Sequence, residues 1–262
     1  MHELETIVLG VIQGLTEFIP ISSSGHLVIA QNFFSGASDH LFLEFINIGT
    51  LLALLVYFRR KIIDIIRDIF INKKYKLALN ILITAIPAGV VGFILADFIN
   101  ATSFFGSLLV VAVTLGTVGI VMVVLERLPK ASAVAGGESL SPVRALLIGL
   151  AQILALIPGV SRSGSTIIAG RLAGLSSASA AEYSFLASLP IMFGVTLKIF
   201  VTDQVYLSEN LVPLIIGNTA AFIAGILAVG FLMKYLSRHS LAVFGWYRIG
   251  LSAIIVIVLL VQ

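Results

Sequence analysis

The sequence predicts an all-α protein that crosses a membrane several times. Of its 262 residues, 59% are hydrophobic and only 11% are charged, and its mean hydropathy is +1.11. A soluble domain carries about 25% charged residues. Several almost uncharged stretches are about 20 residues long, which is the length that an α-helix needs to cross a hydrocarbon core of roughly 30 Å. The chain has no cysteine, which excludes a disulfide framework and thiol chemistry.

Six stretches are long enough to span a membrane, and two further apolar stretches are interrupted. The predicted spans are 40–58, 76–100, 104–126, 178–200, 211–236 and 241–261. Residues 4–34 and 142–174 contain clusters of Pro, Gly and Ser near their middles, so that each half is too short to cross. Polar backbone at membrane depth survives only where protein or a water-filled cavity surrounds it. We therefore predict two re-entrant helical hairpins.

Basic residues indicate which loops are cytoplasmic. Seven of the sixteen Lys and Arg residues lie in 58–76. The segments after the third and the fifth span carry Arg127, Lys130, Arg144, Lys234 and Arg238. If the spans alternate, these three segments fall on one side, and the positive-inside rule makes that side the cytoplasm. The Gly-rich stretch 136–141 is expected to be a flexible cytoplasmic linker between two halves.

The chain contains an internal repeat. GVIQGLTEFIPISSSGH (10–26) aligns without a gap with GLAQILALIPGVSRSGS (149–165), and five of the identical positions are Gly, Gln or Ser. In a mostly apolar chain, chance matches would be Leu, Ile or Val. One hairpin and three spans in each half, 1–127 and 142–262, give an odd number of crossings. The predicted fold is therefore a single membrane domain with an inverted-topology repeat, whose hairpin tips meet near the midplane.

The second tip, PGVSRSGST (158–166), combines groups that favour an oxyanion. Its predicted phosphate-binding residues are Ser161, Ser163, Gly164, Ser165 and Thr166. The N-terminus of the following half-helix presents free N–H groups and a positive dipole end. Arg162 adds a planar fork that suits paired phosphate oxygens. The alternative is that the serines only cap the helix and that Arg162 reaches water, but an arginine at a helix break inside a membrane costs at least ~2.5–3.5 kcal/mol.

The first tip, ISSSGH (21–26), repeats this hydroxyl-rich design with a titratable group. Its predicted phosphate-binding residues are Ser22, Ser24 and Gly25. His26 takes the place of the arginine and titrates near neutral pH. Gln13 and Glu17, four residues apart, share one helix face, where their oxygens would suit Mg²⁺ or Ca²⁺ bound partly through phosphate and water. A helix–helix hydrogen bond for Gln13, and a buried structural pair for Glu17 and His26, stay open as alternatives.

Together these residues predict hydrolysis of a lipid phosphate. Ser23 or a water would attack, His26 would move the proton, and Arg162 with the cation would hold the developing charge. A site inside the membrane implies a substrate whose tail stays in lipid. The competing hypothesis is a transporter or flippase of the lipid phosphate, since inverted repeats are a transport architecture. The Glu17–His26 pair beside Ser23 favours the enzyme, because a carrier needs no proton handler next to a nucleophile.

The same motifs resemble those of a known family. GVIQGLTEFIPISSSGH resembles the (E/Q)xxxE and PxSSxGH motifs, and PGVSRSGST the PGxSRSG motif, of the bacterial undecaprenyl-diphosphate phosphatases of the bacitracin-resistance type. LEFINIGTLLALL (43–55) and the pair Tyr247–Arg248 extend the resemblance over the whole chain. It implies a multi-pass enzyme of the bacterial cytoplasmic (inner) membrane with a site open to the outer, periplasmic face. It also implies that phosphate is released from undecaprenyl diphosphate to regenerate the carrier lipid for cell-wall synthesis.

The resemblance implies roles for individual residues and for a divalent cation. The residues carried over are Gln13, Glu17, Ser23, His26 and Arg162. Gln13 stands where the family often has Glu, and Asn47 where it often has Gln, so Glu17 would carry most of the cation binding. The expected partners are the polyprenyl diphosphate substrate and membrane lipid, and no nucleic acid. A homodimer is left open.

Other polar residues in the spans have simpler expected roles. Glu44 and Glu182 each open the first span after a hairpin and are expected to support the hairpins by hydrogen bonds, with a position facing the membrane interface as the alternative. Arg248, inside the last span, is expected to pair with an acid or to extend to water. Three histidines near segment ends are expected to be solvated: His2, His40 and His239.

Overall fold

The computed structural model of the protein describes residues 3–30, 33–34, 39–128 and 134–261. In chain order the helices are α1 (Glu3–Phe18), α2 (Ser23–Ala30), α3 (His40–Phe45), α4 (Asn47–Tyr57), α5 (Arg59–Phe70), α6 (Lys76–Ile94), α7 (Ala96–Ala101), α8 (Leu108–Leu125), α9 (Pro142–Ile153), α10 (Arg162–Leu172), α11 (Ser177–Thr202), α12 (Gln204–Glu209), α13 (Leu211–Leu236) and α14 (Ala242–Val261). Short 3₁₀ turns are η2 (Ser103–Gly106), η3 (Gly137–Ser139) and η4 (Leu154–Leu156). Within the described residues the fold is all-helical, with one isolated β-bridge between Val134 and Leu175.

Six helical segments of the described chain are long and apolar enough to cross a membrane. They are α3 continued by α4, α6, α8, α11, α13 and α14. The predicted all-α fold is thereby confirmed for the described residues, as is the prediction of six helical segments of spanning length. The predicted spans 76–100 and 104–126 were too long toward their shared loop. There α6 ends at Ile94, and a short helix and a 3₁₀ turn precede α8.

The two interrupted stretches each form a pair of short helices. Residues 4–34 contain α1 and α2, separated by the turn at 19–22, and residues 142–174 contain α9, η4 and α10. The proline and serine clusters end the first helix of each pair because proline cannot donate to the helical ladder and the following serines favour a cap. Each half therefore stays too short to be a span.

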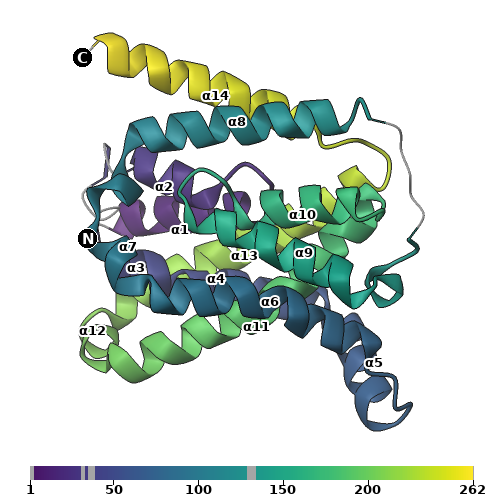
Figure 1. The fold of residues 1–262 in the computed structure, drawn as a ribbon. Coiled ribbons are helices and arrows are strands. Elements are labelled where there is room, and N and C mark those ends of the chain that lie inside the picture. Colours follow the sequence, from purple (N-terminus) through teal and green to yellow (C-terminus); the bar gives the residue numbers. More distant parts are fainter. Residues whose placement is uncertain (1–2, 31–32, 35–38, 129–133, 262) are drawn as a thin grey trace.

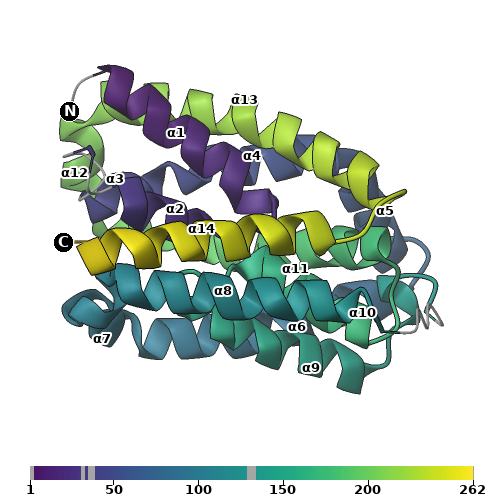
Figure 2. The same ribbon diagram turned by 90° about the horizontal axis from the view of Figure 1, so that it is seen from above.

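Glycines let the helices approach one another closely. A Cβ atom at Gly14 of α1 would lie 2.5 Å from a backbone oxygen of α13, and one at Gly149 of α9 would lie 2.6 Å from a backbone oxygen of α6. Gly119 of α8 and Gly245 of α14 face each other in the same way: a Cβ atom at either one would lie 2.8 Å from the carbonyl oxygen of the other. Figure 2 shows α8 and α14 side by side along their length. Small residues at such crossings are typical of helices that associate in lipid.

The two ends of the helix bundle differ in charge. Both chain termini, α3, α7 and α12 gather at one end, and α5 and the turn from α13 to α14 lie at the other (Figures 1 and 2). Helix α5 carries the densest run of basic residues and projects from that second end without a buried residue (Figure 1). The strongly basic segments therefore share one end of the molecule.

The segment at 136–141 is fixed in place, so the prediction of a flexible linker was wrong. Asn80 of α6 donates its amide to the carbonyls of Gly137 and Leu140 at 3.0 and 3.1 Å. Gly137 packs so tightly against the Tyr183 ring that a Cβ there would overlap it. The backbone can reach this buried position because glycine has no side chain. Here the glycine permits close packing and does not indicate a flexible backbone.

Candidate active site

The turns between α1 and α2 and between α9 and α10, the two tips, lie in direct contact. The Ser163 hydroxyl donates to the Glu17 backbone carbonyl at 3.3 Å, and the Gly159 N–H donates to the Ser24 hydroxyl at 3.4 Å. Residues 146 and 135 positions apart in the chain are thus joined by backbone as well as side-chain groups. This contact places the polar groups of both tips in one region of an apolar molecule.

Both tips have the same local geometry at aligned positions. Ser22 and Ser161 adopt a left-handed backbone conformation, with φ of 76° and 75°. Such a conformation costs of order 1–3 kcal/mol for a residue that is not glycine. Each serine oxygen accepts from the N–H three residues on, that of Gly25 at 3.2 Å and that of Gly164 at 3.1 Å. These caps start α2 and α10 and offset part of the strain.

A hydrogen-bonded cluster around Glu17 joins three of the predicted catalytic residues. One carboxylate oxygen of Glu17 lies 2.8 Å from an Arg162 guanidinium nitrogen. The other oxygen accepts from the Ser23 hydroxyl at 2.6 Å and from the Gln13 amide at 3.0 Å. The side chains of Glu17 and Arg162 are only 12% and 19% exposed, so water screens their attraction weakly. The cluster therefore holds the Glu17 carboxyl group between a hydroxyl and a guanidinium group.

Asn47 orients the amide of Gln13 toward Glu17. The Asn47 side-chain nitrogen donates to the Leu43 carbonyl at 2.9 Å, which leaves its oxygen to accept from Gln13 at 2.6 Å. The Gln13 nitrogen is consequently the atom that also faces Glu17. A glutamate at position 13 would instead bring a second negative charge next to Glu17. The glutamine at this position is accommodated by Asn47, whose side-chain oxygen accepts its hydrogen bond.

The predicted divalent cation fits these residues only together with other oxygens. Within the described part of the chain, no group of three or more His, Cys, Asp or Glu side chains could hold a metal ion. Carboxylate, amide and hydroxyl oxygens around Glu17 are the hard ligands that Mg²⁺ and Ca²⁺ prefer, and Mg²⁺ is often bound by one or two carboxylates plus substrate phosphates. Both Glu17 oxygens already accept hydrogen bonds, so a cation would have to share them.

His26 lies outside the Glu17 cluster. Its Nδ1 is 2.7 Å from the Ser22 carbonyl oxygen and its Nε2 is 2.7 Å from the Tyr247 hydroxyl. Because a carbonyl only accepts, Nδ1 carries a proton, and in the neutral ring Nε2 accepts from Tyr247. No hydrogen bond in the described structure joins His26 to Glu17 or Ser23. The described part of the structure therefore contains no hydrogen bond through which His26 could pass a proton directly to or from Ser23, the transfer that the sequence predicted.

Most of the predicted phosphate-binding hydroxyls serve the tips themselves. The buried ones are Ser22, Ser161, Ser163, Ser165 and Thr166. Ser165 and Thr166 donate back to the Arg162 carbonyl at 3.0 and 2.8 Å. Among the described residues that line the cavity at the cluster, Ser24 is the only one from the predicted phosphate-binding set, beside the predicted nucleophile Ser23. A phosphate contact for the buried hydroxyls stays a prediction.

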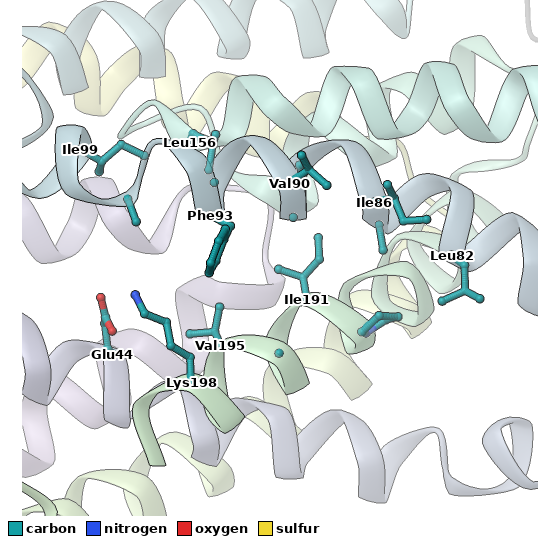
Figure 3. A pocket seen from close by; sticks show the side chains of 17 residues that line it. Glu44, Leu82, Ile86, Val90, Phe93, Ile99, Leu156, Ile191, Val195 and Lys198 are labelled. Atoms are coloured by element: carbon teal, nitrogen blue, oxygen red, sulfur yellow. The ribbon is translucent and has the colours of Figure 1, made fainter. Parts of the chain in front are cut away.

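Two cavities meet beside this cluster. One of about 630 Å³, which we call the polar cavity, is lined on one side by Gln13, Glu17, Ser23, Ser24 and Asn47 and elsewhere mostly by apolar residues. A predominantly apolar one, also of about 630 Å³, runs between α6 and α11 (Figure 3). Both are lined by Glu44, Ile99 and Leu156, so they adjoin. Polar groups at one end and an apolar channel at the other suit an amphiphilic ligand.

Arg248 is the functional-site residue whose role the sequence did not show. It is fully buried and donates to the carbonyls of Pro20, Gly159 and Val160, the first and the last at 3.1 Å, so one side chain ties both tips to α14. The expectation that it pairs with an acid or extends to water was wrong. The sequence did contain a signal for it. A charged residue inside an apolar span is energetically costly, which indicates that it has a functional or structural role.

The two expected hairpin supports do not support the hairpins. Glu182 forms an ion pair with Lys61 of α5 at 2.9 Å, and Glu44 lines both cavities. No hydrogen bond of the described structure joins either carboxylate to a tip. His40 and His239 are exposed as predicted, and His2 lies outside the described residues.

Fold and site together define a polytopic helical membrane protein with an acid–serine–arginine site at the contact of two broken helices. The family model of the bacitracin resistance protein BacA matches residues 6–254. Over 259 residues the chain is 38% identical to the undecaprenyl-diphosphatase of Acinetobacter baumannii, with 97% of this chain and 94% of that one covered. It is 36% identical over 257 residues to that of Nitrosomonas eutropha (97% and 93% covered) and 39% over 259 residues to undecaprenyl-diphosphatase 1 of Clostridioides difficile (96% and 94% covered). The chain belongs to the BacA family.

Proposed function

We propose that this protein hydrolyses undecaprenyl diphosphate to undecaprenyl phosphate and inorganic phosphate. The relatives carry the name of that activity, and they are matched over nearly their whole length. The observation that carries the proposal on this chain is the hydrogen-bonded series Ser23–Glu17–Arg162, which combines a hydroxyl, a base and a cation from both tips. Such a nucleophile–base contact, with positive charge beside it, is the arrangement that phosphoryl transfer needs.

Ser23 is the nucleophile in this scheme and Glu17 is its base. The Ser23 oxygen forms a bond to the terminal phosphorus, the bond from that phosphorus to the bridging oxygen breaks, and undecaprenyl phosphate leaves. Glu17 takes the Ser23 proton, which passes to solvent. Water then attacks the phosphoserine, and Glu17 accepts a proton from that water and returns it to Ser23 as inorganic phosphate is released. Arg162 stabilises the charge on the transferring oxygens in both steps.

A divalent cation belongs to this scheme as a partner of the substrate. Glu17 would hold it, with Gln13 or Asn47 nearby and the diphosphate supplying further oxygens. Such an ion neutralises phosphate charge and polarises the bonds to phosphorus. His26, in turn, acts on the first tip: by holding the Ser22 carbonyl it fixes the backbone that presents Ser23.

The two helix pairs, α1–α2 and α9–α10, are re-entrant hairpins of an inverted repeat in this proposal. Three observations support it: the matching left-handed serines, the matching caps, and the way in which α1 packs on α13 while α9 packs on α6. The basic end of the bundle then faces the cytoplasm. The polar cavity opens toward the opposite end, which is the periplasmic face of a bacterial inner membrane.

Release of inorganic phosphate from farnesyl diphosphate by the purified protein in detergent tests the function. The wild-type chain should release phosphate, and Glu17→Ala should lose at least about 10³-fold in kcat, because base and guanidinium anchor disappear together. Glu209→Ala, an exposed acid near α12, is the control and should keep full activity. If the wild-type protein bound the substrate but released no phosphate, the proposed hydrolysis would be refuted and a carrier of lipid phosphate would be favoured.

Removal of divalent cations should abolish phosphate release. Treatment with EDTA is expected to inactivate the protein, and Mg²⁺ or Ca²⁺ should restore it, because Arg162 alone neutralises little of the diphosphate charge and the Glu17 carboxylate adds a further negative charge. The measurement is the phosphate-release rate against free cation concentration. Unchanged activity in excess chelator would remove the cation from the scheme.

A further inference from the structure

A lysine stands where the polar and the apolar cavity adjoin. Lys198 of α11 lines the apolar cavity beside Glu44, and Glu44 lines both cavities. Figure 3 shows the Lys198 and Glu44 side chains facing each other at one end of the apolar cavity, while Phe93, Val90, Ile86 and Leu82 follow one another away from them. Lys198 and Glu44 therefore lie at the border between the polar cavity, which suits a phosphate head group, and the apolar cavity, which suits a prenyl chain.

Lys198 lacks the close acidic partner that Lys61 of α5 has at the other end of α11. No ion pair of 4.0 Å or less involves Lys198 within the described chain. At the opposite end of α11, by contrast, Glu182 binds the Lys61 ammonium at 2.9 Å. A lysine without a bound carboxylate inside an apolar span is costly unless it serves a ligand or reaches water. Lys198 is therefore free to bind an anion at the border of the two cavities.

The order of groups along the cavities matches the order of groups in a prenyl diphosphate. The reactive cluster of Ser23, Glu17 and Arg162 takes the terminal phosphate. The prenyl chain requires apolar walls, which α6 and α11 provide. The ester phosphate links the two, so it must lie at the border between them, where Lys198 is placed.

We propose that Lys198 binds the ester phosphate of the lipid substrate and retains it on the monophosphate product. This inference rests on the proposed function and adds to it a residue that determines specificity for a prenyl-linked phosphate. Glu44 is the positioning residue in the same arrangement, because its carboxylate faces the ammonium and attracts it toward the cavity end rather than toward lipid, without an ion pair of 4.0 Å or less between these two described residues.

Substitution of Lys198 should change substrate affinity rather than the chemical step. Lys198→Met is expected to raise KM for farnesyl diphosphate at least about tenfold, the usual effect of losing a charge-assisted hydrogen bond, while kcat stays within about threefold. Competitive inhibition by farnesyl monophosphate should weaken by a similar factor, since the ester phosphate is common to both. Lys198→Arg should restore most of the affinity for both compounds.

Lys61→Met is the matched control. It removes a lysine facing the same helix at the other end, and KM should stay within about twofold of the wild-type value. The proposal is overturned if Lys198→Met leaves KM unchanged, and also if it raises KM while inhibition by farnesyl monophosphate is unaffected, because the lysine would then contact the terminal phosphate. Thermal unfolding of Lys198→Met and Lys198→Arg in detergent confirms that both are folded. A wild-type chain that releases no phosphate would instead refute the proposed function itself.

Discussion

Arg162→Ala should lower kcat/KM for a prenyl diphosphate by about 10³-fold or more, without unfolding the protein. Removing one preorganised donor of a transition-state anion costs about 10²–10³-fold, and an arginine that stabilises a transferring phosphoryl group contributes about 10³–10⁵-fold. In this chain the loss has a second part. Arg162 also binds Glu17 at 2.8 Å, so its removal releases the base that faces Ser23.

The measurement is steady-state phosphate release from farnesyl diphosphate, with circular dichroism to establish helicity. Arg162→Lys should recover only part of the rate, because an ammonium cannot present the two parallel donors of a guanidinium. Arg144→Ala, which removes an exposed arginine from the first turn of α9, should be fully active. Full activity of Arg162→Ala would refute the assignment of the second tip to the active site.

Arg248→Met should remove activity and stability together. Arg248 donates to three backbone carbonyls, those of Pro20, Gly159 and Val160. Each buried carbonyl left without a donor costs about 1–3 kcal/mol. The variant should therefore lose about 3 kcal/mol or more of unfolding free energy, which lowers the apparent Tm by about 6 °C or more for a chain of this size.

Activity distinguishes this anchoring role from simple stabilisation. At a temperature where Arg248→Met is still folded, kcat should remain at least about tenfold below the wild-type value, since a small displacement of the tips separates Ser23 from the substrate phosphate. Trp246→Ala, two positions away on α14 and 57% exposed, is the control and should leave kcat unchanged. A folded Arg248→Met protein with normal kcat would show that the tips hold their geometry without this residue.

The local patterns of the chain were sufficient for the six spans, for the two helix breaks and for the centre of the site. Uncharged stretches of span length fixed α13 and α14 closely, because the bilayer thickness sets the length of a crossing helix whatever its neighbours are. Breaks at Pro20 and Pro158 marked the tips, because proline ends a helix by its own geometry. Glu17, Ser23 and Arg162 stood out because charged and hydroxyl groups inside an apolar chain are costly and therefore rarely accidental.

The local patterns did not predict the contacts between residues that are distant in the sequence. His26 was expected to serve Ser23, three residues before it, yet its ring bonds the Tyr247 hydroxyl, 221 positions away. Gly137 was expected to be flexible, yet Tyr183 and Asn80 hold its backbone. In each case the residue type was identified correctly and the neighbour was not, because hydrogen-bond direction depends on which helix lies alongside.

The sequence by itself determined that the chain is an all-helical membrane protein and that an acid, a serine and an arginine at its two helix breaks form the polar centre. Only the tertiary structure decided which atoms meet: that Ser23 bonds Glu17, that Arg248 joins both tips, and that a polar and an apolar cavity adjoin at Glu44 and Lys198. The reason is physical. Hydrophobic length and helix breaking are properties of a segment, whereas the partner of a buried polar group is set by the packing of helices that the chain brings together from far apart.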